Sequence, residues 1–167
     1  MIIYNKILVP YDSSKLSDIA LDHAIRIAKM SSISSSDNMV NVILFYVTPE
    51  IHIPFTFGTM LFKSKKTGET IALREYIKEL YFEIKSNAIK MLDDKTKEYR
   101  NITNTSLQSK VIIGNPADEI IKFADDEKVD LIIMGTTGLA GVSKFKAIGS
   151  VARSFSEKAK CPVMLVR

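Results

Sequence analysis

Residues 129–155 determine the fold expected for this chain, and they read VDLIIMGTTGLAGVSKFKAIGSVARSF. An unbroken apolar run, Leu131 to Met134, has the length of one strand and the hydrophobicity of a strand that is covered on both faces of a parallel sheet. It ends at Gly135, and three more glycines follow before apolar residues recur at helical spacing from Ser150 onward. The stretch therefore predicts a strand, a glycine-rich loop and the start of a helix.

A glycine-rich loop that leads into a helix is suited to binding phosphate. The backbone amides of the loop and the positive end of the helix dipole attract an anion, and glycine lets the backbone approach it closely. Glycines also end strands and cap helices for purely conformational reasons. Taken alone, the loop leaves both interpretations open.

The rest of the chain alternates between strand and helix patterns. Short apolar or β-branched runs, which predict strands, cover residues 6–10, 40–47, 107–113 and 163–166. Apolar residues at helical spacing lie within 16–28, 73–91 and 120–124, between these runs. With 167 residues, the sequence predicts one α/β domain over residues 1–167, with an open, doubly wound, five-stranded parallel sheet and helices on both faces.

The glycine spacing resembles that of a known family, the universal stress proteins. Their ATP-binding members carry Gly-x2-Gly-x9-Gly-Ser or Gly-x2-Gly-x9-Gly-Thr after the fourth strand, and Gly135, Gly138, Gly149 and Ser150 stand here in that order. Ten residues, 139–148, separate the second and third glycines where the family pattern has nine. The resemblance implies a Rossmann-like sheet of the universal stress protein type.

Asp12 follows the first expected strand, at the sheet edge where Gly135 follows the fourth. Ligands of doubly wound sheets bind at this edge. A carboxylate there can bond ribose hydroxyls or hold Mg²⁺ through water, and it can equally serve as an Asx turn or a helix cap. The resemblance favours the ligand role, for ribose or magnesium.

The resemblance also implies a full set of nucleotide contacts. The main chain of Val47, at the end of the second strand, would meet adenine, and the glycine loop with the next helix start would hold phosphates and ribose. The expected site residues are Pro10, Asp12, Val47, Met134, Gly135, Gly138, Gly149, Ser150 and Val151. Lys144, Lys146 and Arg153 lie near them in the sequence and could offset phosphate charge.

The segment between residues 48 and 70 is long for a connection within one domain. It is rich in aromatic and other apolar residues and then becomes basic at Lys63, Lys65 and Lys66. We expect an apolar flap that lies on the domain or on a partner subunit; a binding lid is the alternative.

By resemblance, a homodimer would form through the last strand, Val163 to Val166.

Composition narrows the possible functions. The net charge of +4 is small and scattered, so nucleic acid is not an expected partner. The first ten residues lack a basic leader and a long apolar run, so we expect neither a signal peptide nor a membrane partner. We expect a cytoplasmic location. Two histidines and one cysteine, Cys161, are too few and too dispersed for a zinc site.

The sequence thus leads to two hypotheses. The first is a universal stress response protein that binds ATP or another adenine nucleotide with Mg²⁺ and acts as a nucleotide-dependent switch or a slow ATPase. We expect a nucleotide-binding protein rather than an enzyme, since no residue is an evident base for activating water and fast hydrolysis is not expected. The alternative is a dimeric interaction protein of the same fold that binds no nucleotide, which the extra loop residue favours.

Overall fold

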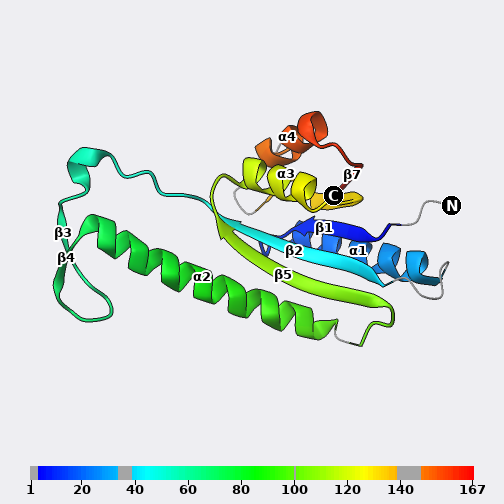
Figure 1. The fold of residues 1–167 in the computed structure, drawn as a ribbon, viewed down its shortest axis with the longest axis horizontal. Coiled ribbons are helices and arrows are strands. Elements are labelled where there is room, and N and C mark those ends of the chain that lie inside the picture. The colour runs from blue at the N-terminus through cyan, green and yellow to red at the C-terminus, as the bar shows by residue number, and fades with distance from the viewer. Residues whose placement is uncertain (1–3, 34–38, 100, 139–147) are drawn as a thin grey trace.

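Five parallel strands form the central sheet of the computed structural model, which describes residues 4–33, 39–99, 101–138 and 148–167 (Figure 1). The strand order is β5-β2-β1-β6-β7. Its strands are β1 (Lys6–Pro10), β2 (Val40–Thr48), β5 (Thr105–Ile113), β6 (Leu131–Gly135) and β7 (Val163–Val166). The predicted fold class is confirmed, although β5 begins two residues before the expected Leu107.

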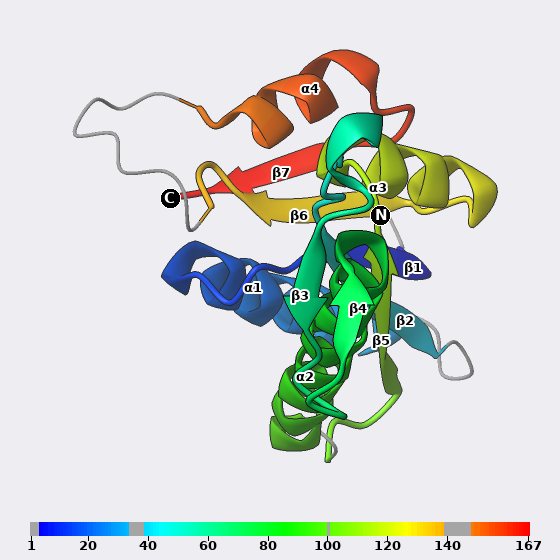
Figure 2. The same ribbon diagram turned by 90° about the vertical axis from the view of Figure 1, so that its left-hand side faces the viewer.

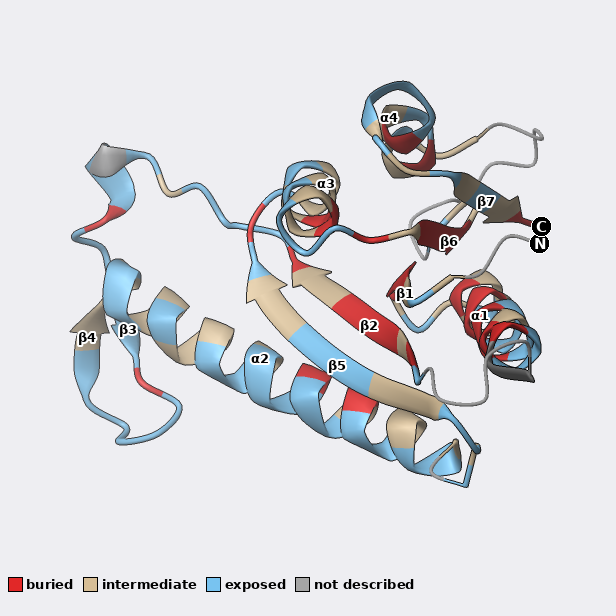
Figure 3. Ribbon diagram, turned by 45° about the vertical axis from the view of Figure 1, so that its right-hand side comes forward, coloured by how far each residue is buried: buried red, intermediate tan, exposed pale blue. Residues whose placement is uncertain are grey.

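Helices cover both faces of this sheet. They are α1 (Lys15–Ile33), α2 (Leu73–Glu98), α3 (Pro116–Asp126) and α4 (Ser150–Lys158). Successive side chains of a strand point to opposite faces. Accordingly Ile7 and Val9 of β1 lie in the core with α1, whereas Leu8 between them lies in the core with α3 and α4. Figure 3 shows the buried residues gathered along the strands and the inner sides of these helices.

Two of the helices that start at the carboxyl edge of the sheet have side-chain caps. The Ser14 hydroxyl accepts a hydrogen bond from the Ser17 N–H at 3.2 Å and so caps α1. The side-chain oxygen Oδ1 of Asn115 accepts from the N–H groups of Ala117 and Asp118, and Pro116 takes the first position of α3. Both caps follow strands directly, so both helices start at the edge where a ligand would bind.

The segment after β2 differs from the expectation of a flap on the domain. It contains a short 3-10 helix, η1 (Phe55–Phe57), and a hairpin of β3 (Leu61–Lys63) and β4 (Thr70–Ala72) that runs into α2. The first half of α2 continues past the end of the sheet, and the hairpin stands on it, away from the strands (Figures 1 and 2). We call residues 49–83 the arm. Within the arm, the hairpin packs against the first turns of α2 rather than over the sheet.

Candidate functional site

A cavity of about 490 Å³ opens at the carboxyl edge of the sheet, where β1 and β6 lie side by side. Here the strand order reverses direction, because the chain moves outward from β1 to β2 and β5 and then returns to the other side at β6. Such a switch point is the usual ligand site of doubly wound sheets, since the loops that leave the two strands diverge.

The structure brings all nine sequence-predicted site residues to the wall of this one cavity. They come from the end of β1 and the turn after it, the end of β2, the end of β6 and the loop after it, and the N-cap and first turn of α4: Pro10, Asp12, Val47, Met134, Gly135, Gly138, Gly149, Ser150 and Val151. The loop between Gly138 and Ile148, including the extra residue, Lys144 and Lys146, lies outside the described residues.

Asp12 and Gly138 both line the cavity and lie directly against each other. One carboxylate oxygen of Asp12, Oδ1, accepts a hydrogen bond from the Ser14 N–H at 3.0 Å, so Asp12 forms the Asx turn that precedes α1. The other oxygen, Oδ2, occupies the space that a Cβ at Gly138 would need. The structure therefore shows Asp12 in the Asx-turn role, and its role toward a ligand stays a prediction.

Two other glycines of the loop have structural reasons to be glycine. A Cβ at Gly135 would lie 2.7 Å from the Cβ of Leu16, so the end of β6 can pass α1 this closely only without a side chain. A Cβ at Gly149 would lie 3.2 Å from the Thr136 carbonyl oxygen, to which the Gly149 N–H donates at 2.8 Å. Together these contacts hold the two ends of the loop against α1 and against each other.

The first turn of α4 faces the cavity with its backbone. Gly149 is the N-cap and offers no side chain to the N–H groups of the first turn. Gly149, Ser150 and Val151 all line the cavity. The positive end of the α4 dipole therefore borders the space in front of the glycine loop.

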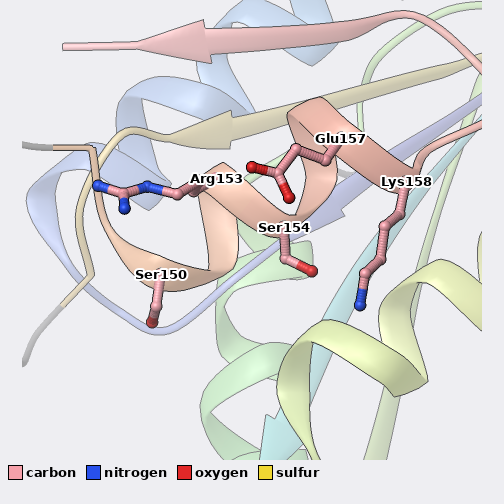
Figure 4. A pocket seen from close by; sticks show the side chains of 5 residues that line it. All are labelled: Ser150, Arg153, Ser154, Glu157 and Lys158. Carbon is pink, nitrogen blue, oxygen red and sulfur yellow. The ribbon is translucent and has the colours of Figure 1, made fainter.

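Arg153 lies one turn further along α4 and does not line the main cavity. It belongs to a second, shallower cavity of about 350 Å³ along the helix surface, together with Ser154, Glu157 and Lys158. Figure 4 shows Ser150 and Arg153 at the start of the helix and Lys158 at its other end. Ser150 borders both cavities. Arg153 therefore lies near the expected phosphate-binding site but does not form part of the wall of the main cavity.

Several wall residues were missed by the sequence prediction. Phe45 and Ile120 form apolar wall, Tyr11 follows β1, and Pro49 follows β2. Pro116 starts α3 at the same sheet edge. The position of Asn115 and Pro116 directly after the third predicted strand was the signal for α3, since every such helix start meets this edge.

Tyr11 fixes the wall of the cavity to both helices of one face. Its hydroxyl donates a hydrogen bond to Asp18 of α1 at 2.7 Å, and Lys95 of α2 lies 3.1 Å from the same carboxylate. Burial, and next the bond to Asp18, raise the pKa of Tyr11 well above its ordinary value. The phenol therefore keeps its proton at neutral pH, and it serves as a positioning contact rather than as a base.

Metal and nucleophile chemistry has little support among the described residues. Within the described ranges, no three His, Cys, Asp or Glu side chains come together as a metal cage. His23 is exposed on α1. Burial raises the pKa of the Cys161 thiol, which makes it a weak nucleophile. Asp12 could therefore hold Mg²⁺ only with water and ligand oxygens completing the shell.

None of the described helices is both long enough and apolar enough to cross a membrane.

Comparison with known proteins identifies the family. The universal stress protein family model matches residues 3–167. The chain is 32% identical to universal stress protein MJ0531 of Methanocaldococcus jannaschii over 99% of this chain and 83% of that protein. The structure resembles universal stress protein UspA from Lactobacillus plantarum, with a TM-score of 0.78, 23% identity and full coverage of both chains.

Two solved proteins of the same fold carry an adenine nucleotide. One is a universal stress protein in complex with cAMP (TM-score 0.62, 19% identity, 99% of this chain and 98% of that one). The other is a family protein from Arabidopsis thaliana with AMP bound (TM-score 0.59, 16% identity, 97% and 90%). At these identities the likeness concerns the fold. On the family match along nearly its whole length, this chain belongs to the universal stress protein family.

Proposed function

We propose that this protein binds an adenine nucleotide, with ATP as the first candidate, in the cavity between β1 and β6. The observation that carries the proposal is the meeting of Asp12, the ends of the glycine loop and the first turn of α4 around one cavity. Each of these elements suits a different part of a nucleotide. The family proteins solved with cAMP and AMP support an adenine ligand as the starting hypothesis.

The phosphates would lie at the first turn of α4. The backbone N–H groups there have no side-chain cap, and the helix dipole favours negative charge at this end. Gly138 and Gly149 leave the backbone accessible on either side. This arrangement binds phosphate through the main chain, so it depends on backbone conformation more than on basic side chains.

The adenine would lie against the apolar part of the wall. Phe45 and Ile120 are almost fully buried and face the cavity, and Met134 and Val151 adjoin them. A flat, apolar ring gains free energy by leaving water for such a surface, while backbone groups near Val47 can hydrogen-bond its edge. The main-chain contact at Val47 is the part that would distinguish adenine from guanine.

Asp12 would meet the ribose hydroxyls, or Mg²⁺ carried by the phosphates. Its Oδ1 already accepts from Ser14, and its Oδ2 faces Gly138. With Asp12 as the one carboxylate on the described wall, a bound Mg²⁺ would take most of its ligands from phosphate and water, which is its usual preference.

We further propose that nucleotide binding acts as a switch and that hydrolysis is slow. The titratable side chains on the described wall are Asp12, Tyr11 and Tyr46. Tyr11 keeps its proton, and Asp12 is engaged by the helix start, so neither is well placed to activate water. We propose a cytoplasmic homodimer paired through β7, which is an edge strand of the sheet; nucleic acid and membranes are not proposed as partners.

The second candidate is an interaction protein of the same fold that binds no nucleotide. The loop between Gly138 and Gly149 is one residue longer than the family pattern, and this favours it. In addition, the close contacts of Gly135 and Gly149 explain those glycines without a ligand.

Isothermal titration of nucleotide-stripped protein with ATP and Mg²⁺ tests the first proposal, with GTP as the matched control. A denatured sample of the purified protein is first analysed for nucleotide that copurified. Saturable heat at one site per chain, with weaker GTP binding, is the expected result. Absence of heat, and of any copurified nucleotide, would favour the interaction protein.

A further inference from the structure

The arm, residues 49–83, is a preformed structure rather than a loose loop. The Phe62 and Tyr76 rings stack with their centroids 5.5 Å apart, which fixes the hairpin on α2. The Leu73 N–H donates to the Met60 carbonyl at 2.6 Å, so the base of the hairpin is closed at the helix start. The Ile51 N–H donates to the Tyr81 hydroxyl, which ties the first residues of the arm to the same helix.

The turn of the hairpin is held as firmly as its base. The Ser64 hydroxyl donates to a carboxylate oxygen of Glu79 at 2.7 Å and accepts from the N–H groups of Lys66 and Thr67. Gly68 has a φ of 73°, which closes the turn in the left-handed region. The ammonium of Lys66 lies 4.1 Å from the centroid of the Phe82 ring. The arm therefore keeps a defined surface.

This surface is apolar and is not covered by the sheet domain. Figure 3 shows the arm beyond the end of β5, with much of its hairpin exposed and two short buried stretches. Six large apolar side chains on it are substantially exposed: Ile51, Phe57, Met60, Leu61, Phe62 and Phe82. Leu61 at 69% and Phe82 at 65% are the most exposed of them. An organised element with this surface is typical of an interface.

The exposed area is close to what a pair of identical arms would need. Side chains of this size carry roughly 150–250 Å² each, so six that are about half exposed leave on the order of 600 Å². A specific interface buries about 1,200 Å² or more in total, which two such surfaces reach together. One arm against a flat surface of other chemistry would leave part of this apolar area uncovered.

The charges of the arm also favour a copy of itself. Residues 49–83 contain five Lys or Arg and five Asp or Glu, so the arm is neutral while the whole chain carries +4. A neutral surface of mixed sign gives no attraction for nucleic acid, an anionic membrane or a strongly acidic protein. Two copies related by a twofold axis can place opposite charges across the interface without net repulsion.

We propose that the arm is a self-association surface, which docks against the arm of a second copy of this chain. This interface is separate from the one proposed at β7. The strand β7 lies at one edge of the sheet, and α2 packs beside β5 at the opposite edge (Figure 2). Where both interfaces form and their twofold axes meet at right angles, the two contacts close a tetramer; where only the arm pairs, the protein is a dimer.

Sedimentation velocity and light scattering of the full chain test this proposal. The variant Leu61→Glu/Phe82→Glu places charge at the two most exposed positions of the arm. The matched control is Met39→Glu, which makes the same kind of change at a methionine that is 63% exposed at the opposite end of β2. Met164→Glu, on β7, reports on the other interface.

The expected result is that the arm variant has half the mass of the wild type, that Met39→Glu keeps the wild-type mass, and that the circular dichroism of all variants is unchanged. If the arm variant loses its fold, Met60→Glu serves as the second variant, because the Met60 side chain is half exposed and the hydrogen bonds of the hairpin base use its backbone. A monomeric wild type would overturn the proposal, and so would an unchanged mass in the folded arm variant. Neither result depends on whether nucleotide binds.

Discussion

The contact between Asp12 and Gly138 gives the sharpest test of the candidate site, through the substitution Gly138→Ala. The added Cβ would overlap Oδ2 of Asp12. The carboxylate must then rotate away, because its other oxygen is held by the Ser14 N–H at 3.0 Å and both cannot be accommodated at once. The methyl group thus disturbs the one carboxylate on the described wall without adding charge.

The magnitude follows from the hydrogen bond that is broken. A hydrogen bond to a charged group contributes about 1.5–3 kcal/mol, and the partly exposed position of Asp12 lets water replace some of this. We therefore expect a loss of about 1 kcal/mol in the free energy of unfolding, or about 2–4 °C in Tm for a chain of this size. If Asp12 also holds ribose or Mg²⁺, the affinity for ATP falls about tenfold, which corresponds to about 1.4 kcal/mol.

A double-mutant cycle separates this mechanism from a direct effect on the phosphates. ATP affinity with and without Mg²⁺ is measured by titration for the wild type, Gly138→Ala, Asp12→Ala and the double variant. If the methyl acts through Asp12, it has little further effect once Asp12 is shortened to alanine. Equal losses in both backgrounds would refute the reasoning, since the methyl would then act on the ligand path itself.

Three further predictions concern other parts of the molecule. Gly135→Ala should destabilise the fold by about 1–3 kcal/mol in urea unfolding, because its Cβ would lie 2.7 Å from that of Leu16; an unchanged midpoint would show that α1 can shift freely. Asn115→Ala should lower the free energy of unfolding by about 1 kcal/mol through loss of the α3 cap, whereas Asn115→Asp, which keeps the acceptor, should not. Burial and the bond to Asp22 raise the pKa of Tyr99 to about 12. An unfolded tyrosine ionises near pH 10, so its stabilising effect is complete below about pH 10 and is lost as the pH rises toward 12. Between pH 10 and pH 12, the free energy of unfolding measured with urea should therefore decline less for Tyr99→Phe than for the wild type. An equal decline in both proteins would contradict the raised pKa of Tyr99.

Much of the sheet and the site could be predicted because their signals are local. Apolar runs such as Leu131 to Met134 define strands, and residues that follow parallel strands must meet at one edge. For this reason Asp12 and Gly135, which are far apart in the sequence, could be placed at one edge of the sheet. The resemblance of the glycine spacing then added Val47 and Gly138 to the expected site and suggested the ligand class.

The arm could not be predicted in the same way. Its strands β3 and β4 have three residues each, too short for an alternating pattern to be recognised. Their position depends on contacts with α2, such as Ser64 with Glu79 and Phe62 with Tyr76, and no local rule fixes which turn of a helix a hairpin will meet. The apolar side chains that suggested a flap on the domain are instead displayed away from it.

The amino-acid sequence by itself determined the order of strands and helices along the chain and the edge of the sheet at which Asp12 and Gly135 meet, because periodicity and strand ends are encoded within short segments. Only the tertiary structure decided that Oδ1 of Asp12 accepts from Ser14, that Tyr11 is tied through Asp18 to Lys95, and that the arm stands free of the sheet. These features depend on distances between segments that are remote in the sequence, and such distances are set by the packing of the whole chain.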